Sequence, residues 1–525
     1  MQRIKGRFFL LSVIVTLFSS YCLAQSVPTI EHWDKERKIK RSEGVLLDGL
    51  EHGTWYYYYK NGALQEQVNF EKGMKSGEAK SFYISGELKA KTNFLRNRED
   101  GLFESFYPNG EKMTVGNYKA AYKIGEWLTY WPNQTLKTKV MYTWDDPKFV
   151  TASDSAGTET MIDGNGSLYT YFSDGSLQSK ITYKDSVKHG DFKEYYFSGA
   201  LSCAGNFKSG KQHGKLECYY SDGKIKSVRN YTDGIEDGVA LDLSTEGDTL
   251  FYTLTNKGVA NGRIVQAYPN KIREYDGYTS GGEKHGVWNF YYPSGVVQNK
   301  AQYNAGKKTG DWKFYDLKGN VRRTGPYAND EKSGTWKQFD EKGKVLQIVN
   351  YKNGLEDGEW KAFYPDGKKN TIGQYLAGKM TGVWTTYFET GKVKFTTTYL
   401  EGKKEGESVT HKANGKPLLI EHYKQGLKEG KYTEYDPKSD NVVVEGLYKN
   451  DKKEGEWKYF AGYGALMREE SYKDGLQHGV SITYDAKGTV ILKSQYKNGK
   501  LNGDYIIYVD GKPARTTRYV DGKKQ

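Results

Sequence analysis

Aromatic and polar residues alternate along most of the chain in short runs, and each run ends at a glycine-containing turn. The segments 359–364 and 369–375 show the two-residue alternation of β-strands, and Asp366-Gly367 between them favours a tight hairpin turn. We expect each strand of such a hairpin to be about six or seven residues long, with Gly354 and Gly358 bracketing the connection between hairpins. No window after the N-terminus sustains the 3.6-residue apolar period of an amphipathic helix. The pattern therefore predicts an all-β chain made of hairpins.

The hairpin pattern repeats with a fixed period. Alignment on the second glycine of the string Tyr-x-x-Gly-x-x-x-Gly gives nineteen units, most of them 24 residues apart. An aromatic residue follows this anchor glycine by five positions in sixteen units, Trp follows by two positions in eight, and Tyr or Phe follows by seventeen in fifteen. A lone hairpin is marginal in water, so the units must stack on one another. We predict an elongated, single-layer, twisted solenoid of about nineteen 24-residue β-hairpin repeats.

Irregularities in the period set the predicted boundaries. They are a signal peptide at 1–24, an N-terminal cap at 25–46, repeats 1–4 at 47–142, an insertion at 143–165, repeats at 166–237, degenerate repeats at 238–278, repeats at 279–519 and a tail at 520–525. We expect the insertion to be an ordinary excursion from the sheet. The alternative is a calcium loop, because four acids lie in it: Asp145, Asp146, Asp154 and Asp163.

The N-terminus has the features of a secretory leader. Arg3, Lys5 and Arg7 precede an apolar run at 8–18, and small and polar residues lead to a cleavage site after Ala24. We therefore expect an exported chain, in the periplasm, in the outer envelope or secreted. Lipidation of Cys22 is the alternative, although Tyr21 stands where a small residue is expected.

The repeat resembles a known family. The string Tyr351-Lys352-Asn353-Gly354, followed by Gly358-Glu359-Trp360, is similar to the MORN repeat, and in particular to the bacterial variant described in exported proteins as antitoxin-like. The resemblance covers about residues 47–519. It implies an extended β-hairpin scaffold for protein–protein or membrane contacts, and the motif brings no catalytic residues with it.

Composition excludes several classes of protein. The chain has 61 Gly, 45 Tyr, 15% aromatic residues and a mean hydropathy of −0.80, which disordered chains, collagens and polytopic membrane proteins do not combine. The net charge of +13, or +10 without the leader's three cations, is a mild bias over this length and does not indicate nucleic-acid binding. Lysines at the turns are a solvated rim, with weak attraction to anionic lipid headgroups or polysaccharide as the alternative.

Catalytic and metal chemistry find little support. Five of the eight histidines precede the anchor glycine and are therefore turn residues, and residues of one repeat column lie too far apart to converge on a metal. Nucleophile elbows, phosphate-binding glycine loops and zinc spacings do not occur in the sequence. We expect no enzymatic activity, no metal and no cofactor.

Two cysteines remain in the exported chain. Cys203 and Cys218 lie on successive strands, and their midpoint falls inside the connecting turn, so they can lie opposite each other. Two interpretations stay open: a disulfide between them, or two buried thiols that act as small apolar residues.

The aromatic columns offer the candidate binding site. Positions two and five after the anchor glycine face opposite sides of a strand, so a single layer cannot bury both. The rings are either the structural core or an exposed groove for a peptide, glycan or lipid, and the groove would contain Trp288, Trp312, Trp336, Trp360 and Trp384. We expect a non-enzymatic, exported scaffold for a protein partner in the cell envelope. The alternatives are an antitoxin-like neutralising protein and a glycan- or lipid-binding adhesion module.

Overall fold

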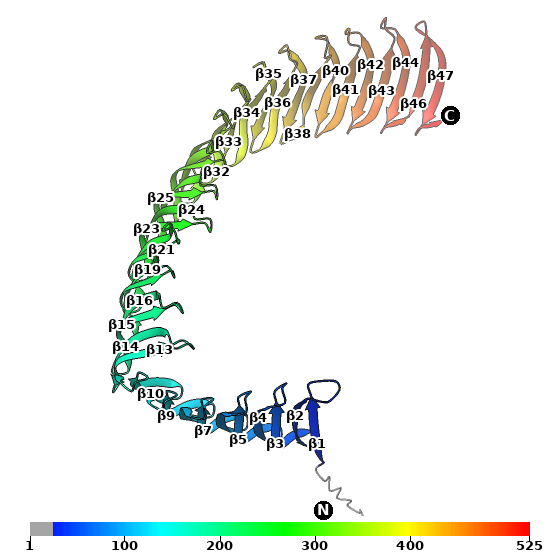
Figure 1. Cartoon of the computed structure of the whole chain (residues 1–525). Coiled ribbons are helices and arrows are strands. Elements are labelled where there is room, and N and C mark those ends of the chain that lie inside the picture. Colours follow the sequence, from blue (N-terminus) through cyan, green and yellow to red (C-terminus); the bar gives the residue numbers. More distant parts are fainter. Residues whose placement is uncertain (1–24) are drawn as a thin grey trace, which may run out of the picture. The chain divides into compact units, whose positions relative to one another are not determined.

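A computed structural model describes residues 25–525, and the predicted signal peptide, with Cys22 and the cleavage site after Ala24, lies outside the described residues. All described secondary-structure elements are β-strands, and consecutive strands pair antiparallel in an open sheet (Figure 1). Residues 25–525 contain no helix with the length and apolarity needed to cross a membrane. The all-β fold of stacked hairpins predicted from the sequence is confirmed.

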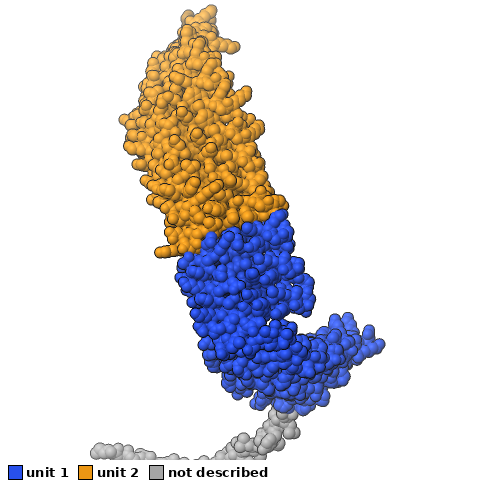
Figure 2. Space-filling model, turned by 60° about the vertical axis from the view of Figure 1, so that its left-hand side comes forward, with its two compact units in different colours: residues 1–235 blue, residues 236–525 orange. Residues whose placement is uncertain are grey.

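The chain divides into two compact units at residues 235 and 236 (Figure 2). The strands of the first unit are β1 (Ser26–His32), β2 (Lys40–Leu47), β3 (Leu50–Tyr58), β4 (Leu64–Glu71), β5 (Met74–Phe82), β6 (Leu88–Leu95), β7 (Arg98–Phe106), β8 (Lys112–Lys119), β9 (Tyr122–Tyr130), β10 (Leu136–Thr143), β11 (Asp146–Ser153), β12 (Glu159–Ile162), β13 (Asn165–Tyr171), β14 (Leu177–Lys184), β15 (Val187–Tyr195), β16 (Leu201–Lys208), β17 (Lys211–Gln212), β18 (Gly214–Tyr219) and β19 (Ile225–Thr232).

The second unit continues the same hairpins, and the short β20 (Ile235–Glu236) falls at the division. Its strands are β21 (Gly238–Leu243), β22 (Thr249–Asn256), β23 (Val259–Ala267), β24 (Arg273–Ser280), β25 (Glu283–Tyr291), β26 (Val297–Asn304), β27 (Lys307–Tyr315), β28 (Val321–Ala328), β29 (Glu331–Lys332), β30 (Gly334–Phe339), β31 (Val345–Lys352), β32 (Leu355–Phe363), β33 (Lys369–Leu376), β34 (Lys379–Tyr387), β35 (Val393–Leu400), β36 (Lys403–His411), β37 (Pro417–Lys424), β38 (Leu427–Lys428), β39 (Gly430–Tyr435), β40 (Val442–Lys449), β41 (Lys452–Phe460), β42 (Leu466–Lys473), β43 (Leu476–Tyr484), β44 (Val490–Lys497), β45 (Lys500–Leu501), β46 (Gly503–Val509), β47 (Lys512–Val520) and β48 (Lys523–Lys524).

Two kinds of connection alternate along the sheet. Within a unit, Tyr364 and Gly367 close a short loop, in which the Gly367 N–H donates to the Tyr364 carbonyl at 2.8 Å. Between units, Asn353 and Gly354 form a two-residue turn with φ of 50° and 76°, which non-glycine residues other than Asn and Asp seldom adopt. We name the sheet margins after them: the loop edge carries loops such as 364–368, and the turn edge carries turns such as 353–354.

The anchor glycine has a different role from the one the sequence predicted. The connection between hairpins is only the two-residue turn, and β32 begins three residues before Gly358 and is nine residues long. Gly358, at φ 102°, lies in a bulge where Asn350 alone stands opposite residues 357–359. Asn350 fills this bulge by donating its Nδ2 hydrogen to the Glu359 carbonyl at 2.8 Å. The first glycine of the repeated pair therefore lies in a turn, and the second, four residues later, lies in a bulge.

The prediction that the insertion leaves the sheet is wrong. Strands β11 and β12 pair with each other and with their neighbours β10 and β13, so residues 143–165 add a short hairpin to the same layer. The acids serve its turns: Asp145 Oδ1 accepts the Lys123 N–H at 2.7 Å, and Asp154 Oδ1 accepts the Thr158 N–H at 2.8 Å. The insertion is therefore a shortened hairpin of the same sheet.

Candidate functional site

The five candidate tryptophans lie on one side of the sheet, which we call the packed face. Their side chains stand on strands β25, β27, β30, β32 and β34, at alternate positions that share a face with the neighbouring aromatic rings. The exposed fractions of four of them are at most 8%: Trp288, Trp312, Trp336 and Trp384. Trp360 is half-buried. Little of these five rings is therefore left for a ligand to contact.

A small residue on the preceding strand makes this burial available. It is glycine in most units, and it is Ala301 beside Trp312, whose indole still donates to the Gln302 carbonyl at 3.3 Å. The indole of Trp336 lies flat on Gly325, where an added Cβ would stand 2.3 Å from the ring atom Cδ2. The Trp336 N–H then reaches across the strand and donates to the Pro326 carbonyl at 2.9 Å. Gly325 has no left-handed φ, so space and not backbone conformation requires glycine here. The same arrangement holds for the pairs Gly44–Trp55, Gly116–Trp127, Gly277–Trp288, Gly373–Trp384 and Gly446–Trp457.

Trp360 shows the arrangement with a larger residue in this column. The residue opposite it is Val349, whose side chain is buried. Among residues 25–525, Trp360 makes no indole hydrogen bond to the preceding strand, and its ring contacts Trp384 at a centroid distance of 5.3 Å. The same size of preceding residue also occurs with a small partner: buried Val68 lies opposite Ala79 instead of a tryptophan. Paired residues of adjacent strands therefore compete for the same space on this face, so a large side chain packs best opposite a small one.

Lysines cover the aromatic rings of the packed face. The Lys284 ammonium lies 4.7 Å from the ring centroid of Trp288 and 5.1 Å from that of Tyr303. Burial against the rings lowers the pKa of Lys284, and burial likewise lowers the pKa of Lys332 over Trp336. Rings held between strand and ammonium gain cation–π attraction and lose exposure. The packed face is thus the closed core of the array.

The two cysteines of residues 25–525 are joined. Cys203 on β16 and Cys218 on β18 face each other in register, with a Cα–Cα distance of 4.0 Å, and form a disulfide. Strand β17 and a bulge at His213 lie between β16 and β18 in the sequence, and β16 and β18 pair directly. The disulfide therefore links one hairpin to the next.

The turn histidines and acids act on the backbone. The side chain before the anchor glycine accepts the N–H of the residue that begins the next turn. Asp357 Oδ2 accepts from Ala377 at 3.1 Å, and His213 Nδ1 accepts from Asp233 at 3.3 Å. Residues 25–525 contain no group of three or more His, Cys, Asp or Glu side chains that could hold a metal ion. These side chains connect adjacent turns and form no reactive cluster.

The loop edge carries a repeated tyrosine position whose hydroxyl group donates a hydrogen bond, and the sequence analysis did not identify it. The aromatic residue six positions after the anchor glycine donates to a backbone carbonyl of the next unit. Tyr364 Oη reaches the Tyr387 carbonyl at 2.7 Å, and Tyr292 Oη reaches the Tyr315 carbonyl at 3.0 Å. The recurrence of tyrosine at this position every 24 residues could have revealed the hydroxyl column. The recurrence is incomplete, because Phe388 and several polar residues occupy the same position in other units.

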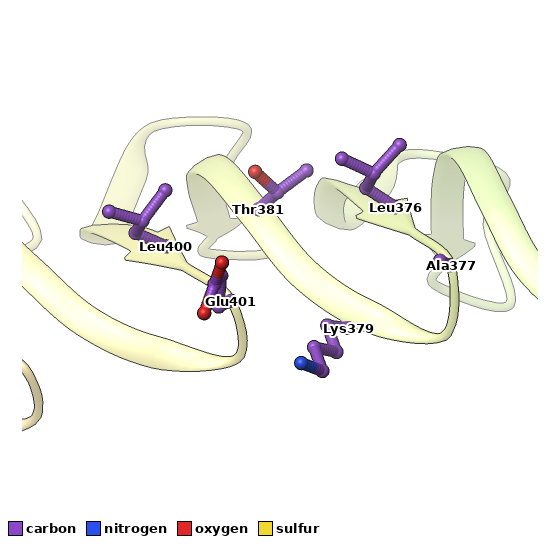
Figure 3. A pocket seen from close by; sticks show the side chains of 6 residues that line it. All are labelled: Leu376, Ala377, Lys379, Thr381, Leu400 and Glu401. Carbon is purple, nitrogen blue, oxygen red and sulfur yellow. The ribbon is translucent and has the colours of Figure 1, made fainter.

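At the turn edge of the second unit, highly exposed aliphatic side chains lie beside a hollow. Leu376 and Leu400 are 62% and 57% exposed and stand on neighbouring turns of the second unit. Together with Thr381, Lys379 and Glu401 they line a mostly apolar hollow of about 280 Å³ (Figure 3). Leu355, 52% exposed, extends the row by one turn and packs on Gly378. This row, Leu355, Leu376 and Leu400, is named the leucine row below.

Comparison with known families finds one match. The family described as "MORN repeat variant" matches ten segments of the chain, namely 51–72, 99–120, 164–185, 212–233, 284–305, 308–329, 332–353, 356–377, 380–401 and 477–498. Each segment is one hairpin with the turn that follows it. Hairpins between the matched segments, such as β5–β6 and β41–β42, have the same turns and pairing, so the repeat continues through them. No curated protein matches the chain.

Several solved structures match at low similarity. The crystal structure of TcdB2-TccC3-Cdc42 has a TM-score of 0.14 and 11% identity, over 92% of this chain and 27% of that one. The crystal structure of TcdB2-TccC3 has a TM-score of 0.13 and 11% identity, over 95% and 35%. The structure of the Photorhabdus luminescens Tc holotoxin pore has a TM-score of 0.12 and 11% identity, over 90% and 28%. This chain spans about a third or less of the matched chains, and we draw no conclusion from these similarities.

Proposed function

Because this chain is a MORN-repeat protein, with the repeat variant at ten positions, we propose that it is a non-enzymatic, exported scaffold that binds a protein partner in the cell envelope. The leucine row on the turn edge is the binding surface. Its exposed side chains are the observation that carries the proposal, because the large side chains of the packed face are already buried under lysines.

The chemistry of the leucine row suits a protein partner. Leu376 and Leu400 stand on neighbouring turns, with Lys379 and Glu401 beside them (Figure 3), and the exposed Leu355 stands at the turn before. An apolar strip with a charged margin is the usual anatomy of a protein interface, in which the apolar centre gives affinity and the charges give orientation. Some turns carry lysines at these positions, as at Lys449 and Lys452, and others carry single exposed aliphatic residues, as at Leu427 and Leu476.

Other features support an exported binding role. A disulfide between Cys203 and Cys218 persists in an oxidising compartment, which favours export. The ionisable side chains of the turns are engaged by backbone groups, which favours a binding role over a catalytic one. A row of hairpins with the same fold also gives a partner a rigid surface, which loses little conformational entropy on binding.

The test compares two well-exposed leucine positions, Leu400 at 57% and Leu317 at 67%. A photo-crosslinking amino acid is placed at Leu400 on the turn edge or at Leu317, 67% exposed, on the loop edge, and crosslinked proteins are recovered from the native envelope. We expect a protein adduct from position 400 that position 317 does not give. The purified partner should then bind the wild type and lose affinity for the Leu376→Glu/Leu400→Glu variant, while Leu317→Glu binds as the wild type does.

Other outcomes of this experiment contradict the proposal. Equal adducts at both positions, or undiminished binding by the double variant, would show that the leucine row is not the interface. Recovery of a toxic protein that the chain neutralises would support the antitoxin-like alternative. Adducts with glycan or lipid alone would support the adhesion alternative.

A further inference from the structure

The loop between β1 and β2 and the first residues of β2 carry an excess of basic side chains. Residues 33–39 connect the strands, and residues 33–41 contain two acids, Asp34 and Glu36, against five bases: Lys35, Arg37, Lys38, Lys40 and Arg41. None of the proposed functions above uses this loop. It lies on the first hairpin of the described chain, whereas the leucine row belongs to the second unit.

This basic loop is held in one conformation. The Asp34 carboxylate accepts the backbone N–H groups of Lys38 and Ile39 at 2.9 and 2.7 Å, and these bonds lower the pKa of Asp34. The Trp33 N–H closes the loop on the Ile39 carbonyl at 2.9 Å. The indole of Trp33 also donates to the Tyr58 carbonyl of the next hairpin at 3.0 Å. A loop fixed at both ends presents its charges without first being ordered by a ligand.

Three lysines are among the residues that line a hollow beside this loop. The hollow has a volume of about 470 Å³ and is lined by Lys38, Ile39, Lys40, Tyr58, Lys60, Asn61 and Gly62. Lys40 pairs with Glu43 at 2.7 Å. Within residues 25–525, Lys38 and Lys60 make no ion pair, and the Lys60 ammonium lies 5.6 Å from the ring centroid of Trp33. The hollow therefore holds more positive charge than its neighbours neutralise.

We propose that this hollow binds a phosphate group. Two lysines of one hollow that make no ion pair match the two charges and several oxygens of phosphate better than the single charge of a carboxylate. Lys40, already shared with Glu43, adds a third donor at the margin. A free phosphate ester and the headgroup of an anionic lipid both present this chemistry.

The test uses the chain 25–525 and two probes. Inorganic pyrophosphate is titrated by calorimetry, and phosphatidylcholine vesicles with or without phosphatidylglycerol are tested by co-sedimentation. The variant Lys38→Gln/Lys60→Gln removes the two unpaired charges. The control Lys72→Gln/Lys89→Gln removes the same charge from exposed lysines of the same unit. Circular dichroism and the variant Lys38→Arg, which keeps the charge, separate loss of the site from loss of the fold.

We expect saturable binding of at least one probe, weakened about tenfold by Lys38→Gln/Lys60→Gln and less than about twofold by the control. Pyrophosphate binding identifies a soluble phosphate ligand, and binding only to phosphatidylglycerol vesicles identifies a lipid headgroup. Failure of the wild type to bind either probe overturns the proposal. Equal loss in the two double variants also overturns it, because the effect would then come from net charge. A failure here leaves the leucine row untouched, since the two surfaces share no residue.

Discussion

Replacing Gly373 with valine tests whether the residue beneath an indole decides its burial. A Cβ at position 373 would stand 2.1 Å from Trp384 Cδ2, so the ring must leave its seat. The chain already contains the expected outcome, because Trp384 over Gly373 is 8% exposed and Trp360 over Val349 is half-buried. We expect Gly373→Val to destabilise the wild type and to be tolerated when Trp384 is replaced by alanine.

The magnitude follows from two losses. The Trp384 indole gives up its hydrogen bond to the Gln374 carbonyl, 3.2 Å long, which is worth about 1 kcal/mol. Exposing about a quarter of a buried tryptophan returns roughly 50 Å² to water, which costs about 1 kcal/mol at ~25 cal/mol per Å². The better strand propensity of valine offsets less than about 1 kcal/mol. In the Trp384→Ala background only that gain remains, so the coupling energy between the two positions is about 2 kcal/mol.

Hydrogen exchange of β33 and β34 measures this energy in the region concerned. Repeat arrays open locally, so a single global unfolding energy would dilute the effect. The four proteins of the cycle are the wild type, Gly373→Val, Trp384→Ala and the double variant, and Thr385→Val on the opposite face of β34 controls for strand propensity. Equal destabilisation by Gly373→Val in both backgrounds would refute the argument, because it would show that the ring and the glycine do not compete for space.

Three further predictions concern other parts of the array. Replacing Cys203 and Cys218 with serine removes a link across 15 residues, and we expect β16 and β18 to lose up to about 3 kcal/mol of local stability by hydrogen exchange; unchanged exchange would contradict this. Tyr364→Phe should cost about 1 kcal/mol at the loop edge and Phe388→Tyr should gain a similar amount, and effects of the same sign would count against the hydroxyl column. Burial raises the pKa of Tyr58 to about 12, so the folded state holds this proton more tightly than the unfolded chain; its contribution should be constant below about pH 10 and lost as the pH rises through about 12, and Tyr58→Phe should flatten that part of the denaturation profile.

The sequence predicted the repeat itself because repetition averages out local error. Nineteen copies of one pattern identified the hairpin, the period and the aromatic columns, and every predicted unit is a hairpin in the structure. Boundaries within the unit were less accurate. The strand containing Gly358 was predicted to start after the glycine, since two nearby glycines suggest a loop, whereas the second glycine lies in a bulge whose partner, Asn350, comes from the previous strand.

The insertion at 143–165 shows the same limit. Its acids suggested either an excursion or a calcium loop, and only strand pairing revealed that it is a reduced hairpin of the same sheet. The basic hollow beside Lys38 and Lys60 could not be found from the sequence either. These lysines lie on different hairpins, and a folded loop brings them to one hollow.

The sequence by itself determined that this chain is a hairpin array, because turn glycines and alternating strands act over short distances and are repeated many times. Only the tertiary structure decided which aromatic rings are core and which surface stays open. Alternation places Trp336 and Phe339 on opposite faces but does not say which face is closed. That depends on the glycine one strand earlier and on the lysine that covers the ring, and both act across the sheet, where the distance between residues is set by pairing and not by sequence.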